Sequence, residues 1–242
     1  MTTELNLPPP YRAVVLAGAD EDARSHAGRL AADGAAAGTL VWRPDAERLD
    51  CAVVLRPEET GEQVLPAVLV AALALSDAIG AVGPPAVASD FVWPDSVRVN
   101  GGLVGVVAVA LEPASLRRIP DWAVAAADIR IAPETGIEGG ERPDVTCLEA
   151  EGFGAVGARE LAEAFARYLL VWMDRWEEQG LAPIARHWLH RMTARNRETV
   201  VLLGGERVAG AIATLDETGR LHLETGRGRR QLTLAAWYEA GL

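Results

Sequence analysis

The chain has 242 residues, a formal net charge of −11 and 50% hydrophobic residues, a balance typical of a soluble globular protein with one or two domains. All 23 basic residues are arginine, and the absence of lysine excludes Schiff-base catalysis, attachment of pyridoxal phosphate and the lysine of a GxxxxGK[ST] phosphate loop. The acidic balance argues against a nucleic-acid partner, because neutralising phosphates requires a concentrated basic face.

The expected elements alternate between strands and helices until a change in texture near the C-terminus. The expected strands of the larger part are, in chain order, 13–16, 39–42, 49–55, 90–93, 97–99, 103–111 and 122–131. The expected helices are 20–32, 63–80, 158–180 and 183–192. Asp20 is expected to cap the first helix, and Asn100-Gly101 is a strong hairpin-turn signal. A polar, glycine-rich loop is expected at 135–144.

The tail has the texture of short strands separated by turns. The expected strands there are 200–203, 208–215, 221–224 and 231–234. So many short strands in a short segment predict a small barrel appended to the main domain. We therefore expect two domains, 1–195 and 196–242.

Cysteine usage and the N-terminal segment favour a cytoplasmic protein. Cys51 and Cys147 are far apart and lack CxxC spacing, so we expect neither a disulfide framework nor a thiolate zinc site. The opening residues show no signal-peptide pattern. The most apolar stretch, 64–82, contains Pro66 and Asp77 and predicts a core helix, so no membrane partner is expected.

Residues 91–107 read FVWPDSVRVNGGLVGVV and are the most informative segment of the chain. They resemble the signature hairpin of the biotin and lipoate protein ligases, which reads roughly KWPND, a short strand, then N-G-x-K-L-A-G-I-L. The residues that match are Trp93, Pro94, Asp95, Asn100, Gly101 and Gly105. The helix ending in WEEQGLAP is similar to the family's last catalytic-domain helix, and the tail is similar to its SH3-like C-terminal domain.

This resemblance implies an α+β fold, with a mostly antiparallel sheet, flanking helices and a small C-terminal SH3-like β-barrel. It also implies a ligand site between the hairpin and a glycine-containing loop, lined by Trp42, Trp93 and the backbone of 101–105. In the family, the loop that precedes the tryptophan strand is arginine-rich and holds an acyl-adenylate. The corresponding loop here, from Gly34 to Gly38, has no cation. Arg43 is the nearest candidate substitute.

The departures from the family pattern concern catalysis. The resemblance places Gly102 where the ligases have the lysine that contacts the acyl-adenylate, and Val92 where a second lysine precedes the tryptophan. One residue of WPND is also missing. Since the chain has no lysine, no other alignment supplies one.

Three hypotheses of function follow from the resemblance. The first is a ligase-like pseudoenzyme that still binds a small acyl carboxylate of the biotin, lipoate or octanoate class, or its adenylate. The second is a working ligase or acyltransferase in which arginine replaces lysine, with ATP and biotin or lipoate as cofactors. The third is an interaction module that uses the surface on which a biotinyl or lipoyl acceptor domain docks. The family resemblance also suggests a homodimer.

Other motifs have simpler explanations. The sequence GRGRR at 226–230 spells a phosphate-loop motif in the wrong place, and a solvated arginine turn is expected, with a displaced phosphate loop as the alternative. His187 and His190 share a helix face without a further ligand, so no metal site is expected. Cys51 is expected to be an inert core thiol, while Cys147 remains a remote candidate nucleophile.

Overall fold

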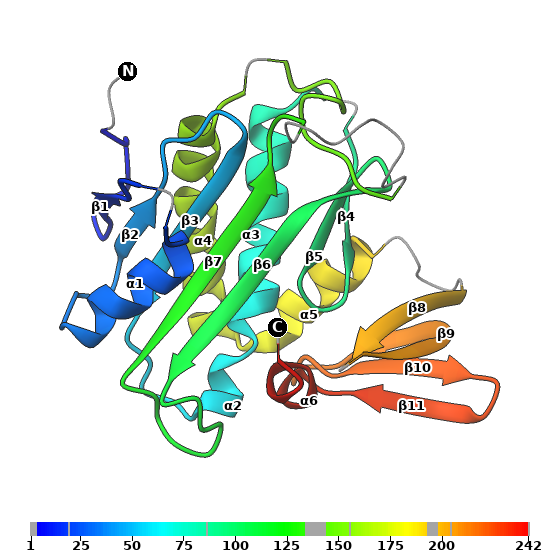
Figure 1. Cartoon of the computed structure of the whole chain (residues 1–242). Helices are drawn as coiled ribbons and strands as arrows, with labels where there is room; N and C mark the ends of the chain where they lie inside the picture. The colour runs from blue at the N-terminus through cyan, green and yellow to red at the C-terminus, as the bar shows by residue number, and fades with distance from the viewer. Residues whose placement is uncertain are drawn as a thin grey trace.

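The computed structural model describes residues 4–18, 20–85, 87–133, 144–154, 156–192, 198–203 and 205–241. Its larger sheet has seven strands in the order β1-β2-β3-β7-β6-β5-β4, as Figure 1 shows. The strands are, in that order, Arg12–Val15, Thr39–Trp42, Arg48–Leu55, Trp122–Arg130, Gly102–Glu112, Ser96–Val99 and Ser89–Val92. β1 pairs with β2 in parallel, and the remaining neighbours are antiparallel. The α+β fold with a mostly antiparallel sheet is therefore confirmed.

Helices cover the two faces of this sheet unequally. α1 (Ala23–Ala32) packs against β2, β3 and β7 on one face. The opposite face is covered by α3 (Ala67–Val82), which packs against β4, β5, β6 and β7, and by α4 (Ala158–Gln179), which packs against β3 and α3. α5 (Leu181–His190) packs against α3 and α4 (Figure 1). Two apolar clusters result, a large one around α3 and a small one under α1.

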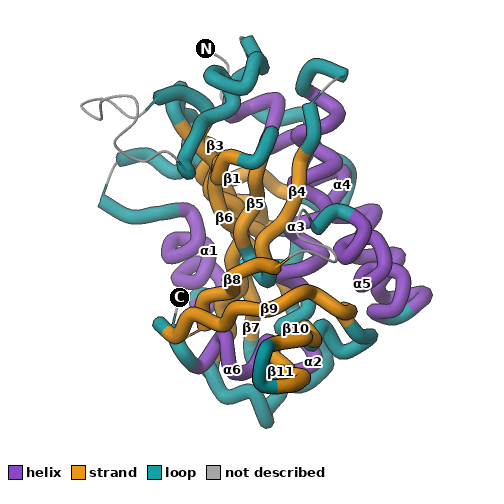
Figure 2. The backbone as a smooth tube through the Cα atoms, turned by 90° about the vertical axis from the view of Figure 1, so that its right-hand side faces the viewer, coloured by secondary structure: helices purple, strands orange, loops and turns teal. Residues whose placement is uncertain are grey.

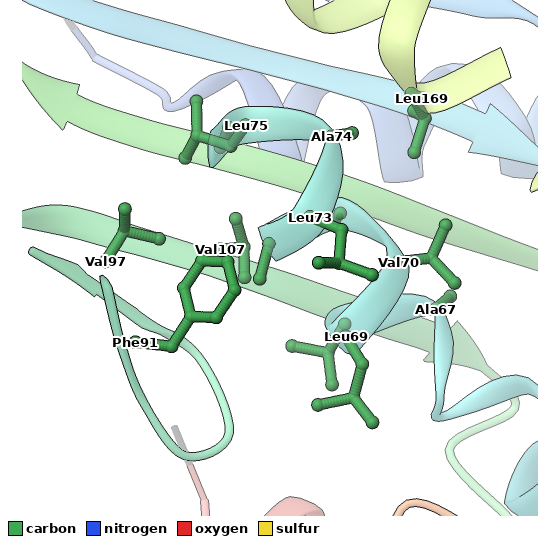
Figure 3. Close-up of a cluster of buried hydrophobic side chains, with 14 of the residues drawn as sticks. Ala67, Leu69, Val70, Leu73, Ala74, Leu75, Phe91, Val97, Val107 and Leu169 are labelled. Carbon is green, nitrogen blue, oxygen red and sulfur yellow. The ribbon is translucent and has the colours of Figure 1, made fainter. Parts of the chain in front are cut away.

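α3 forms the centre of the large cluster. Its side chains are apolar almost all round, as expected for a helix enclosed between a sheet and another helix. Figure 3 shows Leu73 and Leu75 of α3 near Val97, Val107 and Phe91 of the sheet. The segment Gly61–Val82 is long and apolar enough to cross a membrane, but 83% of its most apolar window is buried inside the protein. The prediction of a core helix is thus consistent with its packing.

Two helix starts differ from the sequence prediction. The N-cap of α1 is Asp22 rather than Asp20, since the Asp22 carboxylate accepts the Ser25 N–H at 2.7 Å. The helix predicted at 63–80 is divided into α2 (Gly61–Val64) and α3, with Pro66 as the residue before α3. Proline has no N–H to donate to a preceding helical turn and is tolerated only at a helix start, which accounts for the break.

The tail forms a second, four-stranded antiparallel sheet in the order β11-β10-β9-β8. Its strands are β8 (Glu198–Leu203), β9 (Glu206–Leu215), β10 (Leu221–Thr225) and β11 (Gly228–Leu232). Since β8 and β11 are edges, the sheet is open, and the predicted barrel is not shown by the described residues. The strand predicted at 231–234 ends at Leu232, and α6 (Leu234–Glu239), which the sequence analysis missed, follows.

The second sheet is attached to the larger sheet by hydrogen bonds and apolar contacts. The Trp93 indole N–H donates to the Gly219 carbonyl at 3.3 Å, and the Leu111 N–H donates to the Tyr238 hydroxyl at 3.2 Å. Figure 2 shows this sheet and α6 beside the end of the β4–β5 hairpin. The predicted boundary at 195/196 lies outside the described residues, as does most of the loop predicted at 135–144.

Candidate functional site

The residues that carry the family resemblance lie on different strands and at different levels of the sheet. β2 and β5 run in the same direction, because an even number of antiparallel steps separates them. Gly34 and Gly38 precede β2, and Trp93, Pro94 and Asp95 precede β5. Trp42 is level with Val107 of β6, because Trp42 pairs with Cys51, Cys51 with Ala127 and Ala127 with Val107. Gly102 lies further along the sheet, at the start of β6, where it pairs with Val99 beside the Asn100-Gly101 turn. Arg43 directly follows Trp42. The structure therefore does not gather the predicted site residues into one cluster.

The turn that contains Trp93, Pro94 and Asp95 packs against the second sheet. Trp93 is 2% exposed, and the peptide bond between Trp93 and Pro94 is cis. Burial raises the pKa of the Asp95 carboxyl, although hydrogen bonds from Ser96 and Trp237 oppose the shift. The Asp95 carbonyl also accepts the N–H of Val107 at 2.9 Å. These contacts give the turn a structural role in holding the two sheets together.

The opposite turn, Asn100-Gly101, is fixed by a short polar network. Both residues have positive φ values, 50° and 90°, which is the conformation that an Asn-Gly hairpin turn requires. The Asn100 side-chain amide donates to one carboxylate oxygen of Glu151 at 2.8 Å. The Thr146 hydroxyl donates to the other oxygen at 2.7 Å. Glu151 therefore joins the hairpin to the segment that follows β7.

Gly102, which the sequence resemblance aligns with the family's lysine, lies against the side chain of Thr146. A Cβ atom built on Gly102 would be 2.5 Å from Thr146 Cγ2 and 3.0 Å from Thr146 Cβ. Cβ atoms in folded proteins essentially never come within 3.0 Å of a non-bonded heavy atom, so any side chain at this position requires Thr146 to move. The space that the start of a lysine side chain would need is thus occupied by this chain's own threonine.

Position 105 requires glycine, because the backbone of β7 lies very close to it. A Cβ atom there would overlap the Asp128 carbonyl oxygen and lie 2.8 Å from the Ile129 Cα on β7. The match of Gly105 to the family motif therefore has a packing explanation that does not depend on a ligand.

Arg43 is engaged away from Gly102. Its Nε donates to the Asp50 carboxylate at 3.2 Å, and its terminal nitrogens donate to the carbonyls of Gly18 and Glu21. Asp50 also accepts the Ala23 N–H at the start of α1, at 3.0 Å. Because β3 and β7 separate β2 from β6, three strand spacings, roughly 14 Å, lie between Arg43 and Gly102. This placement does not support Arg43 as the substitute for lysine.

The glycine loop and the tryptophan that follows it also have packing roles. Gly38 has φ +79° and packs so tightly against the Pro10 carbonyl that a side chain would collide with it. Gly34 has φ +94° just after α1. Trp42 is 2% exposed in the large cluster, and its indole nitrogen is buried without a hydrogen-bond partner.

The sequence analysis missed a group of side chains on the α1 side of the sheet, beyond the part that α1 covers. We call this surface the open face and define it by Arg98, Leu103, Val106, Asp128 and Arg130. Alternation along the strands places them there, since the flanking residues of β5 and β7 belong to the cluster around α3. Val106 is 38% exposed. The pattern Val97-Arg98-Val99 is the signal that could have revealed Arg98, because its two valines face the core.

A different concavity lies near the glycine loop, between α2, the end of α4 and the second sheet. It has a volume of about 1060 Å³. Its lining includes five acidic side chains and two arginines: Glu58, Glu59, Glu62, Glu177, Glu217, Arg56 and Arg220. Because the carboxylates outnumber the arginines, the net charge of this lining is negative and disfavours a carboxylate or phosphate ligand.

The weaker candidates of the sequence analysis have ordinary environments. His187 contacts the Trp172 ring edge-on with 5.1 Å between centroids, and burial together with Arg191 lowers its pKa. In the described part of the chain, no three His, Cys, Asp or Glu side chains are placed to hold a metal ion. Both cysteines are free and buried, and burial raises the pKa of Cys51. Arg229, in the GRGRR segment, pairs with Glu224 at an exposed site.

Comparison with known proteins agrees with this fold. The sequence pattern of the Biotin/lipoate A/B protein ligase family matches residues 7–190. This chain belongs to that family. It is 31% identical over 209 residues to a biotin–[acetyl-CoA-carboxylase] ligase of Paracoccus denitrificans, with 83% of each chain covered.

Two solved structures extend the comparison. A biotin protein ligase-like protein of unknown function from Silicibacter sp. is 29% identical, with a TM-score of 0.85 over 96% of this chain and 98% of the other. The biotin protein ligase of Aquifex aeolicus, solved with biotin and ATP, is 18% identical, with a TM-score of 0.74 over 93% of this chain and 96% of the other. At this low identity, the second comparison supports the fold alone.

Proposed function

We propose that this protein binds a small acyl carboxylate of the biotin or lipoate class, or its adenylate, without the lysine-dependent ligation that the family resemblance implies. The observation that carries the proposal is the occupation of the lysine position. Gly102 stands there, Thr146 fills the adjoining space, and all 23 basic residues of the chain are arginine.

The chemistry supports this distinction between binding and catalysis. A cation beside the acyl carbonyl stabilises the negative charge that develops during acyl transfer, and removal of one such donor typically costs about 3–4 kcal/mol in the transition state. Affinity for the ground-state ligand depends on the whole site, including apolar contacts and backbone groups, and survives such a loss more readily. A binding protein with little or no ligase activity is the expected result.

A working ligase is the second candidate, and one observation favours it. Arginine is a permanent cation that can stabilise an oxyanion or a phosphate, and Arg98 lies opposite Leu103, one residue along β6 from Gly102. This candidate differs from the first in one measurable property, the formation of an acyl-adenylate from ATP.

The tail and the protein partners belong to the same proposal. We assign residues 196–242 as the counterpart of the family's SH3-like C-terminal domain, since the open four-stranded sheet follows the matched segment directly. The relative from Paracoccus denitrificans is named for acetyl-CoA carboxylase. A biotinyl or lipoyl acceptor domain is accordingly the first protein partner to test.

The deciding experiment combines ligand binding with ATP–pyrophosphate exchange on the full chain. Biotin, lipoate and octanoate are titrated by calorimetry with and without ATP, and exchange is followed with the same acids. Binding without exchange supports the proposal, whereas exchange above a heat-inactivated control supports the working ligase. If neither binding nor exchange is found, but an acceptor domain binds, an interaction module replaces both candidates.

A further inference from the structure

The Arg98 side chain has no hydrogen-bond or ion-pair partner among the described residues, whereas the other charged side chains of the open face have partners. No hydrogen bond or ion pair joins the Arg98 side chain to any described residue, and its Nε is buried from solvent without a hydrogen-bond partner. A buried donor without a partner costs free energy, and the terminal nitrogens of a guanidinium that lacks an acceptor can donate to an added anion.

The position of Arg98 on the sheet directs it to the open face. Val97 and Val99, its neighbours on β5, are fully buried in the cluster around α3. Strand alternation therefore sends Arg98 to the other side, where its directly opposed residue on β6 is Leu103. Leu103 and the partly exposed Val106 supply apolar surface next to the guanidinium.

The other charged residues of this face are already engaged. Arg48 of β3 pairs with Asp128 of β7 at 2.6 Å, which neutralises the Asp128 carboxylate. Arg130, at the end of β7, has interactions of its own and adds a second cation to the face. Asp90, opposite Arg98 on β4, is the carboxylate nearest in register, and it also has interactions of its own. Arg98 is thus the guanidinium with donors to spare, and guanidinium groups bind carboxylates and phosphates through paired N–H donors.

From this arrangement we infer that Arg98 holds the anionic group of the ligand, either the carboxylate of a free acid or the phosphate of a nucleotide, on the open face between β5 and β7. The inference rests on the proposed function and names the residue that recognises the ligand's charge. The acyl chain then lies over Leu103 and Val106, which are apolar and reachable from solvent.

The test compares Arg98→Met with Arg227→Met. Methionine is unbranched and fills similar space without charge or an Nε donor. Arg227 lies exposed in the turn between β10 and β11, so its replacement makes the same change in net charge away from the open face. Calorimetry on the full chain measures the Kd of biotin, of biotinol, which lacks the carboxylate, and of AMP. Inorganic pyrophosphate is titrated separately by thermal shift.

We expect Arg98→Met to raise the Kd of biotin or of AMP by about 10- to 100-fold, which is the usual effect of losing a charge-assisted hydrogen bond. The Kd of biotinol for Arg98→Met should equal that for the wild type. The Kd values of all three ligands for Arg227→Met should also equal the wild-type values. A loss confined to biotin identifies the carboxylate, and a loss confined to AMP identifies the phosphate. Arg98→Lys should recover part of the affinity.

Unchanged affinities for both biotin and AMP in Arg98→Met would overturn the assignment while leaving the proposed function intact. If the wild-type protein binds none of the organic ligands, the proposed function fails. In that case the pyrophosphate titration still decides whether Arg98 forms an anion site. The melting temperature of Arg98→Met should equal or exceed that of the wild type, because an unpaired buried donor is removed, and a marked fall would show a structural role instead.

Discussion

The lack of space between Gly102 and Thr146 can be tested by its effect on the free energy of unfolding. The change Gly102→Ala places a Cβ atom 2.5 Å from Thr146 Cγ2, which is overpacking of the kind that typically costs about 1–3 kcal/mol. For a chain of this size, such a loss lowers Tm by roughly 2–12 °C. Thr146→Ser removes the Cγ2 atom and retains the hydroxyl that donates to Glu151 at 2.7 Å. In that background, Gly102→Ala should cost much less.

The assay is a double-mutant cycle in urea, with Gly80→Ala as the control. Gly80 lies in α3 with no atom within 4 Å of an added Cβ, so alanine there should be neutral or stabilise by up to about 1 kcal/mol. We expect a coupling energy of about 1 kcal/mol or more between positions 102 and 146. Equal costs of Gly102→Ala in the wild-type and Thr146→Ser backgrounds would refute the claim that Thr146 occupies the lysine position.

Three further predictions concern the remaining motif residues and the charges of the turns. Gly105→Ala should cost about 3 kcal/mol or more in urea unfolding, since its Cβ would overlap the Asp128 carbonyl, and a cost of about 1 kcal/mol or less would contradict this. Burial raises the pKa of Asp95, so its ionised form destabilises the fold at neutral pH. Asp95→Asn should therefore raise Tm at pH 7, with a gain that disappears as the pH falls through the raised pKa to about 4. Burial opposes ionisation of Asp216, but hydrogen bonds from Thr218 and His222 outweigh it and lower the pKa to about 2. Its stabilisation is present above about pH 4 and lost as the pH falls to about 2, so Asp216→Asn should cost about 1 kcal/mol at pH 7 and little at pH 2.

Most of the larger sheet could be predicted from local sequence. Thr39–Trp42 and the strands on either side of Asn100-Gly101 combine β-branched residues with strong turn signals, and their boundaries agree within a residue or two. The open tail sheet could not be predicted in the same way. Whether four strands close into a barrel depends on pairing between distant edges, which no local pattern encodes.

The site was harder to predict, because a sequence motif gives the identity of each residue but not the direction in which its side chain points. Arg43 follows the tryptophan strand as a substitute cation would, yet Asp50 and two carbonyls around the start of α1 take its guanidinium. Arg98 matches no residue of the family motif and stands between two valines of the hairpin, so the local sequence does not mark it as a binding residue. Its importance arises from alternation along β5 together with the helices that leave the open face uncovered.

The absence of lysine from the sequence and the packing around position 102 both indicate that this site does not use a lysine. A lysine lost from an otherwise unchanged site would leave a cavity, and a cavity left unfilled costs stability. Here the space beside Gly102 is filled by Thr146, whose hydroxyl is bound by Glu151, and Glu151 also binds the Asn100 turn. Restoring lysine would therefore require displacement of a satisfied threonine as well as a change at position 102. Position 102 on β6 accommodates only glycine without a shift of Thr146, so a cation for the proposed ligand has to come from another strand, and our candidate is Arg98 on β5.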